Sequence, residues 1–371
     1  MSDERAPLGI SGRIARAFLD SQLTPLLALA AMLMGAFAVL VTPREEEPQI
    51  DVTMANVFVP FPGASAAQVE SLVSSPMEQI LGEIDGVKHI YSVSQAGTAV
   101  LTVEFEVGVP RNEALVRLYN VVYSNRDWRP ANLGVLEPII KPKGIDDVPI
   151  VTLTLWTSDA ARGSYELRQV AHAIEAELQR VPGARNVYTI GGPDDVVHVR
   201  LDAQRLAGHG LSVPSLVQAL TAANVVAHAG EIVGGNAAVP VQVGEFLANR
   251  EDVADLIVGM REGRPVYLQE IATVERAPDQ PERAVWFGAG AAAAAGIELP
   301  DKAPAVTIAI TKKPGSNAID VADALIERVE TLRGVYLPEG VEATVTRNYG
   351  ETANDKATKL IQKLSFATVS V

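Results

Sequence analysis

The sequence predicts an α+β protein in which one membrane-spanning helix precedes two related modules of strands and helices. Three observations predict this architecture: an uncharged apolar run near the N-terminus, a duplicated segment, and the alternation of strand-like and helix-like stretches that follows. The second module is expected to be interrupted by an inserted α+β unit. With 371 residues, the chain is long enough for two or three domains.

The composition excludes several classes of protein. The chain has no cysteine, which rules out disulfides, zinc–thiolate sites, iron–sulfur clusters and cysteine nucleophiles. With 45 Asp and Glu against 31 Lys and Arg, the net charge of −14 argues against non-specific binding of nucleic acids. The mean hydropathy of +0.15 is too high for a disordered chain and indicates that part of the protein lies outside water.

The first element is the apolar run Leu23–Val41, which follows an N-terminal segment at 1–22. At about 1.5 Å per residue, it is long enough to cross a hydrocarbon core of about 30 Å. A cleaved signal peptide is the alternative, because Ala36-Phe37-Ala38 has the small-x-small pattern of a cleavage site. The run continues past that site and is long for a signal peptide, so we favour an uncleaved membrane helix.

The flanks of this run predict its orientation. Arg5, Arg13 and Arg16 precede it, whereas Arg44 is followed at once by three glutamates. The positive-inside rule therefore places the N-terminus in the cytoplasm and the rest of the chain in the bacterial periplasm.

The part after the apolar run contains a duplication. The segment 81–93 aligns with 178–190, and the leucine, glycine, tyrosine and basic positions coincide. The same offset places the strand-like segment 51–60 on 148–157, and a helical stripe lies between strand and repeat in both copies. Each copy is therefore expected to form strand–helix–strand.

The first copy is completed directly and defines a first module at 51–143. Its first helix begins with a capping box of Ser65 and Gln68, and Pro76 should kink or split that helix. A strand at 99–107, a helix at 112–124 and a strand near 137–141 follow. Together they predict a ferredoxin-like module, built from a split βαβ unit.

The second copy is completed only after a long interruption. A strand at 305–311, a helix at 317–332 and a strand at 341–347 supply the missing half. The second module therefore comprises 144–192 and 282–348, and the inserted unit comprises 193–281. We expect Val151–Trp156 and 305–311 to lie in one sheet.

The inserted unit reads as a mixture of short elements. We expect a strand at 196–201, a helix at Val213–Ala223, a glycine-rich extended stretch at 230–244, and a hairpin with strands near 256–260 and 265–268. The low-complexity segment 288–296 should be a mobile or helical linker. The end of the chain, 351–371, begins polar and turns apolar, which fits either an ordinary helix or the start of a second membrane helix.

No motif of an enzyme is found. The chain lacks phosphate-binding, dinucleotide-binding, serine-hydrolase and zinc-protease signatures. Its five histidines are scattered, and no metal site is expected; His172 reads as a surface or packed residue. The pairs Asp146-Asp147 and Asp194-Asp195 lie close to prolines and read as turn residues rather than catalytic carboxylates.

Motifs spread over nearly the whole chain resemble one family. They are Pro60-Phe61-Pro62-Gly63-Ala64-Ser65, Val69-Glu70, Pro76-Met77-Glu78, Asp85-Gly86-Val87 with Ser92 and Gly97, Leu201-Asp202, Leu206-Ala207-Gly208-His209-Gly210-Leu211-Ser212, Ala219-Leu220-Thr221-Ala222-Ala223-Asn224, Gly315-Ser316-Asn317-Ala318 and Asn348-Tyr349-Gly350-Glu351-Thr352. In this order and spacing, they resemble the N-terminal part of a resistance–nodulation–division (RND) efflux permease of the acriflavin-resistance, AcrB-like type.

The resemblance implies a trimeric inner-membrane antiporter that expels small molecules at the expense of the proton motive force, without another cofactor. The modules would be porter subdomains, and the insertion a docking subdomain that faces a periplasmic adaptor and an outer-membrane channel. The loop with Gly230, Gly234, Gly235 and Gly244 would reach into the neighbouring protomer. No residue of this chain matches the family's proton relay, so this portion alone would not couple transport to protons.

The resemblance also implies positions that line the substrate path. They are Pro149, Ile190, Gln280 and Glu282, where well-known members carry phenylalanines in this region. The aromatic lining is therefore missing from this half of the protein.

Three readings of the whole chain stay open. The first is a truncated efflux permease whose next membrane helix starts at 351–371. The second is a complete single-pass periplasmic interaction protein anchored in the membrane. The third is a secreted binding module or enzyme released after Ala38.

Overall fold

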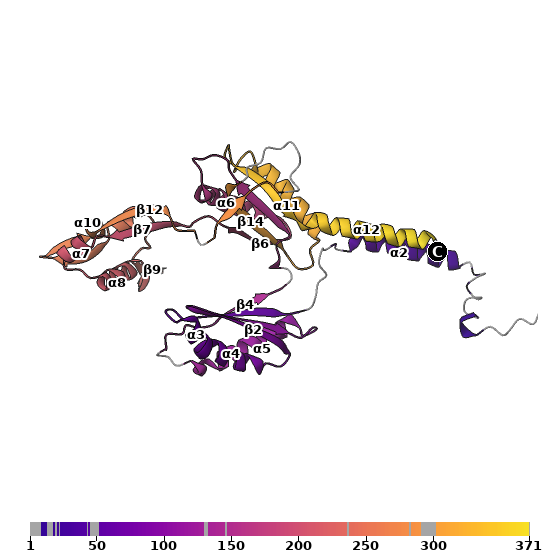
Figure 1. Cartoon of the computed structure of the whole chain (residues 1–371), viewed down its shortest axis with the longest axis horizontal. Coiled ribbons are helices and arrows are strands. Elements are labelled where there is room, and N and C mark those ends of the chain that lie inside the picture. The colour runs from indigo at the N-terminus through magenta and orange to yellow at the C-terminus, as the bar shows by residue number, and fades with distance from the viewer. Residues whose placement is uncertain are drawn as a thin grey trace, which may run out of the picture.

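The computed structural model describes residues 9–12, 18, 21, 23–42, 44, 52–129, 133–144, 147–235, 237–281, 283–290 and 302–370. Over these ranges the chain is a mixed α+β protein with several separate sheets. Figure 1 shows two modules, an inserted unit that projects from the second module, and two long helices that point the opposite way.

The apolar run forms one continuous helix, α2 (Leu23–Val41), and none of its residues is buried. Among the described residues, it is the one helix that is long and apolar enough to cross a membrane. A fully exposed helix without a charged side chain is stable only in an apolar surrounding, so α2 fits a bilayer and not water.

The first sheet is antiparallel and has the strand order β2-β3-β1-β4. Its strands are β1 (Met54–Pro60), β2 (Val87–Gln95), β3 (Thr98–Phe105) and β4 (Ile139–Lys143). The helices of this module are α3 (Ala66–Val69), the π-helical turn η1 (Glu70–Ser74), α4 (Ser75–Gly82), α5 (Arg111–Ser124) and the short 3₁₀ turn η2 (Arg126–Trp128). Val57, Leu101, Met77 and Leu118 are fully buried between the sheet and these helices.

Two local predictions for the first module are confirmed. The Ser65 side chain accepts from the Gln68 amide, while the Gln68 side chain accepts from the Ser65 amide, which closes the capping box. Pro76 lies in the first turn of α4, directly after η1, so the helix is split where proline removes an amide donor.

The second sheet is also antiparallel, with the order β13-β14-β5-β15 and with β6 beside β14. Its strands are β5 (Val151–Trp156), β6 (Ala184–Ile190), β13 (Val285–Phe287), β14 (Ala303–Lys312) and β15 (Glu342–Asn348). Helices α6 (Ser164–Gln179) and α11 (Ala318–Leu332) share the core of this sheet with Leu153, Leu155 and Ile308. The expected pairing of β5 with the strand after the insertion is confirmed, because Ala305 to Ile310 pair with Trp156 to Val151.

The duplication is visible in the structure. β1 and β5 begin at Met54 and Val151, and β2 and β6 begin at Val87 and Ala184, so both pairs differ by 97 positions (151 − 54 and 184 − 87). Gly86 and Gly183 precede the second strand of each copy with φ of 83° and 88°, a conformation that disfavours other residues. Each sheet then places its four repeat strands in the order second, third, first, fourth.

The inserted unit contains two ribbons and a small core. Its elements are β7 (Asp195–Leu201), α7 (Ala203–Gly208), α8 (Val213–Ala223), β8 (Ala227–Gly234), β9 (Ala237–Val243), α9 (Arg250–Ala254), β10 (Ile257–Arg261), β11 (Arg264–Tyr267), α10 (Leu268–Ile271) and β12 (Ala272–Pro278). Strand β12 pairs antiparallel with β7 and returns the chain to the second module. Sequence patterns missed β12, because its sequence, ATVERAP, mixes charged residues with a single large apolar side chain.

The chain continues from β15 into α12 (Tyr349–Ser370) without a loop. A Cβ on Gly350 would lie 2.7 Å from Cβ of Ala322, so the first turn of α12 packs tightly on α11. Arg44, three residues after α2, donates a hydrogen bond of 2.8 Å to Asn354 Oδ1 on α12. The segment that follows α2 therefore contacts α12, and both long helices extend away from the modules in Figure 1.

Two element boundaries differ from expectation. β4 lies about two residues later than predicted, and Asp195 begins strand β7 instead of lying in a turn. Most of the predicted linker at 288–296 lies outside the described residues, as does Asp146.

Candidate functional site

Two of the predicted lining residues share one cavity, of about 220 Å³, where the second module meets the inserted unit. Ile190 ends strand β6, and Gln280 lies shortly after β12, the strand that returns from the insertion. The other lining residues are Arg168, Thr189, Gly191, Gly192, Pro193, Asp194, Asp279 and Arg283. The cavity therefore lies between the two segments of the chain that connect the second module to the inserted unit, the outgoing segment after β6 and the returning segment after β12.

The other two predicted positions are not brought into this cavity. Pro149 precedes β5, whose first residue, Val151, lies opposite Ile310 of β14, whereas Ile190 lies opposite Thr307. Ile190 is therefore level with Thr154 of β5, and Pro149 lies five positions before Thr154 along the chain (154 − 149). Glu282 lies outside the described residues.

Adjacent glycines shape one wall of the cavity. Gly191 and Gly192 have φ of 90° and 73°. A Cβ on Gly191 would lie 2.6 Å from Cγ2 of Val285, and one on Gly192 would lie 2.6 Å from the carbonyl oxygen of Ser164. Only glycine brings the chain this close to α6 and β13 as it leaves β6.

Arg168 on α6 contacts the outgoing segment that connects the second module to the inserted unit. Its Nη1 donates a hydrogen bond of 2.5 Å to the carbonyl oxygen of Gly192, and its Nη2 forms an ion pair with Asp194. The backbone carbonyl of Asp194 accepts from the amide of Asp279, 2.9 Å away, on the returning segment. One helix of the second module thereby fixes the outgoing segment, which in turn holds the returning one.

A second group of side chains connects the outgoing and returning segments at Asp195, the residue after Asp194. We call this meeting place of the second module and the inserted unit the junction. Asp195 accepts from Nε of Arg276 on β12 at 2.9 and 3.1 Å. Arg276 lowers the pKa of the Asp195 carboxyl, and the Tyr165 hydroxyl lowers that pKa further by donating a hydrogen bond. Burial raises the pKa of Tyr165, and the neighbouring Asp195 raises it further.

The face of the second sheet that points away from α6 and α11 carries a chain of hydroxyls. Thr154 Oγ1 lies 3.0 Å from those of Thr307 and Thr346, and Thr346 lies 2.9 Å from Thr152. Trp156 Nε1 donates to Thr344 at 2.9 Å, and its ring stacks on Phe287 with centroids 4.6 Å apart. This face can therefore offer hydrogen-bond donors and acceptors, and its aromatic rings lie at one end.

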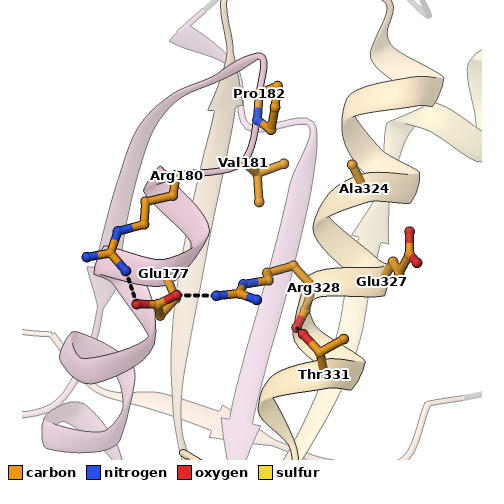
Figure 2. Close-up of a pocket in the computed structure, with 8 residues that line it drawn as sticks. All are labelled: Glu177, Arg180, Val181, Pro182, Ala324, Glu327, Arg328 and Thr331. Carbon is orange, nitrogen blue, oxygen red and sulfur yellow. Dashed lines mark hydrogen bonds and ion pairs between the residues drawn. The ribbon is translucent and has the colours of Figure 1, made fainter.

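A larger cavity, of about 370 Å³, lies between α6 and α11 (Figure 2). Glu177 lines it and pairs with Arg180, directly after α6, and with Arg328 of α11. Arg328 lowers the pKa of the Glu177 carboxyl, so the carboxyl is ionised at neutral pH. Because all three charges are paired with one another within the protein, this arrangement fits a link between helices better than a ligand site.

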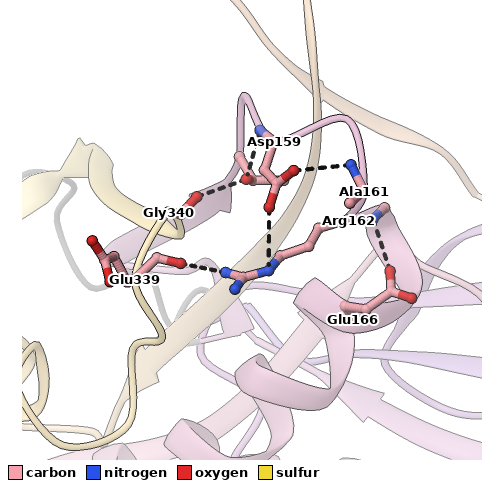
Figure 3. A network of polar contacts seen from close by, with 8 residues as sticks. Asp159, Ala161, Arg162, Glu166, Glu339 and Gly340 are labelled. Carbon is pink, nitrogen blue, oxygen red and sulfur yellow. Dashed lines mark hydrogen bonds and ion pairs between the residues drawn. The ribbon is translucent and has the colours of Figure 1, made fainter.

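A polar network closes the end of the second sheet near Trp156 (Figure 3). Thr157 Oγ1 donates to the carbonyl of Gly340 at 2.6 Å, and Arg162 donates to the carbonyl of Glu339. Asp159 Oδ1 accepts from the amide of Ala161 at 2.9 Å. The network joins the loop after β5 to the turn before β15, and these side chains serve that connection.

The predicted glycine-rich stretch forms an exposed hairpin of β8 and β9. Gly230 lies at an irregularity of the ladder, Gly234 ends β8, and Gly235 has φ of 59° in the turn. A Cβ on Gly244, at the base, would lie 2.2 Å from the carbonyl oxygen of Val225. Ile232 and Val233 are 67% and 77% exposed, so this hairpin presents apolar side chains that nothing in the described chain covers.

Sequence reasoning missed the arginines that organise these sites. Each of three arginines forms an ion pair with a carboxylate that lies far away along the chain: Arg168, Arg276 and Arg328. One available signal was Glu177, a charged residue within the apolar spacing of Ile174 and Leu178. His172, as expected, is half exposed and contacts Glu175. Among the described residues, no group of three or more possible metal ligands occurs.

Comparison with known families agrees with this architecture. The family model described as AcrB/AcrD/AcrF matches residues 14–371, which include α2, both modules, the inserted unit and α12. The match covers far more than half of the chain. The chain therefore belongs to the AcrB/AcrD/AcrF family of RND transporter permeases.

Proposed function

We propose that this protein is part of an inner-membrane pump that exports small molecules, such as drugs or other amphiphiles, from the periplasm or the inner leaflet of the membrane. The observation that carries the proposal is the family match over residues 14–371, which begins before the membrane-compatible helix α2 and includes it. The N-terminus is placed in the cytoplasm and the modules in the periplasm, in keeping with the arginines that precede α2.

In this proposal, 51–143 is a first porter subdomain, and 144–192 with 282–348 is a second one, each ferredoxin-like. Residues 193–281 are a docking subdomain for a periplasmic adaptor and an outer-membrane channel. The equal strand order of the two sheets supports the porter assignment. The chain leaves for the inserted unit at Asp194 and returns at Asp279, and these two residues are joined by a backbone hydrogen bond. This arrangement supports the assignment of 193–281 as one separate unit.

The proton motive force is proposed as the energy source. Helix α2 contains no Asp, Glu, Lys, Arg or His, so it offers no group that could carry a proton across the membrane. Proton coupling is therefore assigned to groups other than α2, and the role proposed for the described modules is to handle substrate.

The cavity with Ile190 and Gln280 is proposed to border the substrate path, together with the hydroxyl-bearing face of the second sheet. The walls are mainly polar and include the glycine pair beside Ile190. Pro149 and Glu282 stay predictions for the same path. A path of this composition favours amphiphiles with hydrogen-bonding groups over purely aromatic compounds.

The pump is proposed to work as a homotrimer. The apolar hairpin of β8 and β9 is assigned to the contact with a neighbouring protomer, with Gly230, Gly234, Gly235 and Gly244 giving it its shape. Its exposed valines and isoleucine support this assignment, because they gain most by leaving water.

Export is tested in bacterial cells without their own efflux pumps that produce the whole permease of which this protein is proposed to be part, with its adaptor and channel. We expect a fluorescent amphiphile to accumulate less than in cells with an empty vector, and a protonophore to abolish the difference. Ile190→Glu should reduce export at unchanged protein level, whereas Val335→Glu, at a 76% exposed position between α11 and β15, should not. Equal accumulation with and without the permease would contradict the proposal.

A further inference from the structure

Helix α12 carries three lysines on one side. Lys356, Lys359 and Lys363 follow one another at spacings of three and four residues, so they form a single stripe along the helix. All three are exposed. No function described above uses this stripe.

The contact between Arg44 and Asn354 sets the depth of this stripe. Arg44 lies three residues beyond the end of α2, and α12 runs back along the direction of α2 from Asn354 (Figure 1). At about 1.5 Å per residue, Lys359 and Lys363 lie about 7.5 and 13.5 Å along α12 from Asn354, in the direction in which α2 runs back from Arg44. Lys359 therefore lies close to the level at which α2 ends, and Lys363 lies about one turn further into the hydrocarbon core that α2 spans.

The stripe lies on the side of α12 that is turned away from Arg44. Asn354 faces α2, and at about 100° per residue the three lysines lie on the opposite side of α12. Leu360 and Phe366 flank the stripe on its two sides and are 58% and 77% exposed. A lysine near the edge of the core can extend its ammonium group toward the headgroups while its stem lies among apolar chains.

We propose that Lys359 and Lys363, with Lys356 above them, bind the phosphate of an anionic phospholipid in the outer leaflet of the inner membrane. The flanking Leu360 and Phe366 contact its acyl chains. This inference rests on the proposed placement of α2 across the membrane. Binding of this kind would hold α12, and through Gly350 the second module, at a fixed height above the bilayer.

The test uses the full chain in nanodiscs that contain equal amounts of phosphatidylglycerol and phosphatidylcholine, followed by native mass spectrometry of the lipids retained. Wild-type protein should retain phosphatidylglycerol preferentially, and inorganic phosphate in excess should not displace it. In the double variant Lys359→Gln/Lys363→Gln, the ratio of retained phosphatidylglycerol to phosphatidylcholine should fall by a factor of about five for each lysine removed. Lys359→Arg/Lys363→Arg should keep it, and the matched control Lys302→Gln/Lys313→Gln, in the second module, should not change it.

Two outcomes would overturn the lipid site. One is equal retention of phosphatidylglycerol in wild type and the glutamine variant. The other is unchanged retention with an altered oligomeric state, which would assign the lysines to a protein partner. Extraction of membranes with alkaline carbonate tests the placement of α2 separately. Release of the wild-type chain by carbonate would contradict both the placement of α2 across the membrane and the lipid site. Retention of the chain would support the placement of α2, whatever the result for the lipid site.

Discussion

Glu177 on α6 forms an ion pair with Arg328 on α11, and this pair joins the two halves of the second module across the inserted unit. The side chain of Glu177 is only 11% exposed, and that of Arg328 is 40% exposed. A carboxylate held largely out of water needs a partner, because its charge would otherwise lose solvation without compensation. The pair therefore helps to hold α11 against α6 beside the cavity that separates them.

Removal of Arg328 tests this link. Arg328→Met removes one of the two cations that pair with Glu177, so it should lower the midpoint temperature of unfolding. The decrease should be only a few degrees, because Arg180 still pairs with Glu177. The control is Arg250→Met, which breaks an exposed pair with the adjacent Glu251 and should leave the midpoint unchanged. Circular dichroism at rising temperature gives both values. Equal shifts in the two variants would show that the Glu177 pair has no special role.

Much of the architecture could be predicted because it follows from local patterns and from the repeat. The position of β14 beside β5 could be expected, since the second copy lacked its closing half until 305–311. The start of α6 and the split at Pro76 follow from residues within one or two turns. Patterns of this kind depend on spacing along the chain, which the sequence displays directly.

The contacts at the junction could not be predicted in the same way. Arg168 could have paired with any nearby carboxylate, and its choice of Asp194 depends on how Gly191 and Gly192 bend the chain toward α6. The separation of Pro149 from Ile190 depends on strand register, which the repeat does not reveal. Long-range partners of this kind follow from the completed fold.

The contact of α12 with α11 predicts that Gly350 cannot carry a side chain. A Cβ there would lie 2.7 Å from Cβ of Ala322 and 3.1 Å from the carbonyl oxygen of Ala318. Overpacking of this kind costs about 1–3 kcal/mol, more than the gain of up to about 1 kcal/mol from replacing a helical glycine with alanine. Gly350→Ala should therefore lower the free energy of unfolding in denaturant titrations.

The matched control for that variant is Gly208→Ala. Gly208 also lies in a helix, but a Cβ added there would have no atom within 4 Å. This substitution should be neutral or stabilising, so the two variants should differ in sign. A stabilising effect at Gly350 would mean that α12 does not pack on α11 as described.

The glycine wall of the junction cavity gives a second test of close approach. Gly192 and Gly315 have nearly equal φ of 73° and 74°, but only Gly192 has neighbours within 4 Å of a Cβ. Gly315→Ala should cost about 1–2 kcal/mol from backbone strain alone. Gly192→Ala should cost a further 1–3 kcal/mol, about the usual penalty of overpacking, because its Cβ would meet the carbonyl of Ser164. Equal losses of unfolding free energy in the two variants would contradict the close approach of this wall to α6.

The ion pair of Asp195 with Arg276 predicts an acid-sensitive junction. Arg276 lowers the pKa of Asp195 in the folded protein, so the pair contributes stability above the pKa of an unfolded aspartate, about 3.9. That contribution is lost as the pH falls from this value through the lower pKa of the folded state. Asp195→Asn should therefore unfold at a lower temperature than wild type at pH 7, and the difference should shrink at pH values below about 3.9.

The control for acid sensitivity is Asp323→Asn, at an exposed position on α11. It removes the same carboxylate chemistry without touching the junction, so its unfolding temperature should stay close to that of wild type at both pH values. Tyr165→Phe gives a complementary result, because it removes one donor to Asp195 but leaves Arg276 in place. Its effect should have the same sign as that of Asp195→Asn and be smaller, since Arg276 is the larger cause of the lowered pKa. If Asp195→Asn kept its full effect in acid, the stability of the junction would have to come from the neutral hydrogen bonds and not from the charge of Asp195.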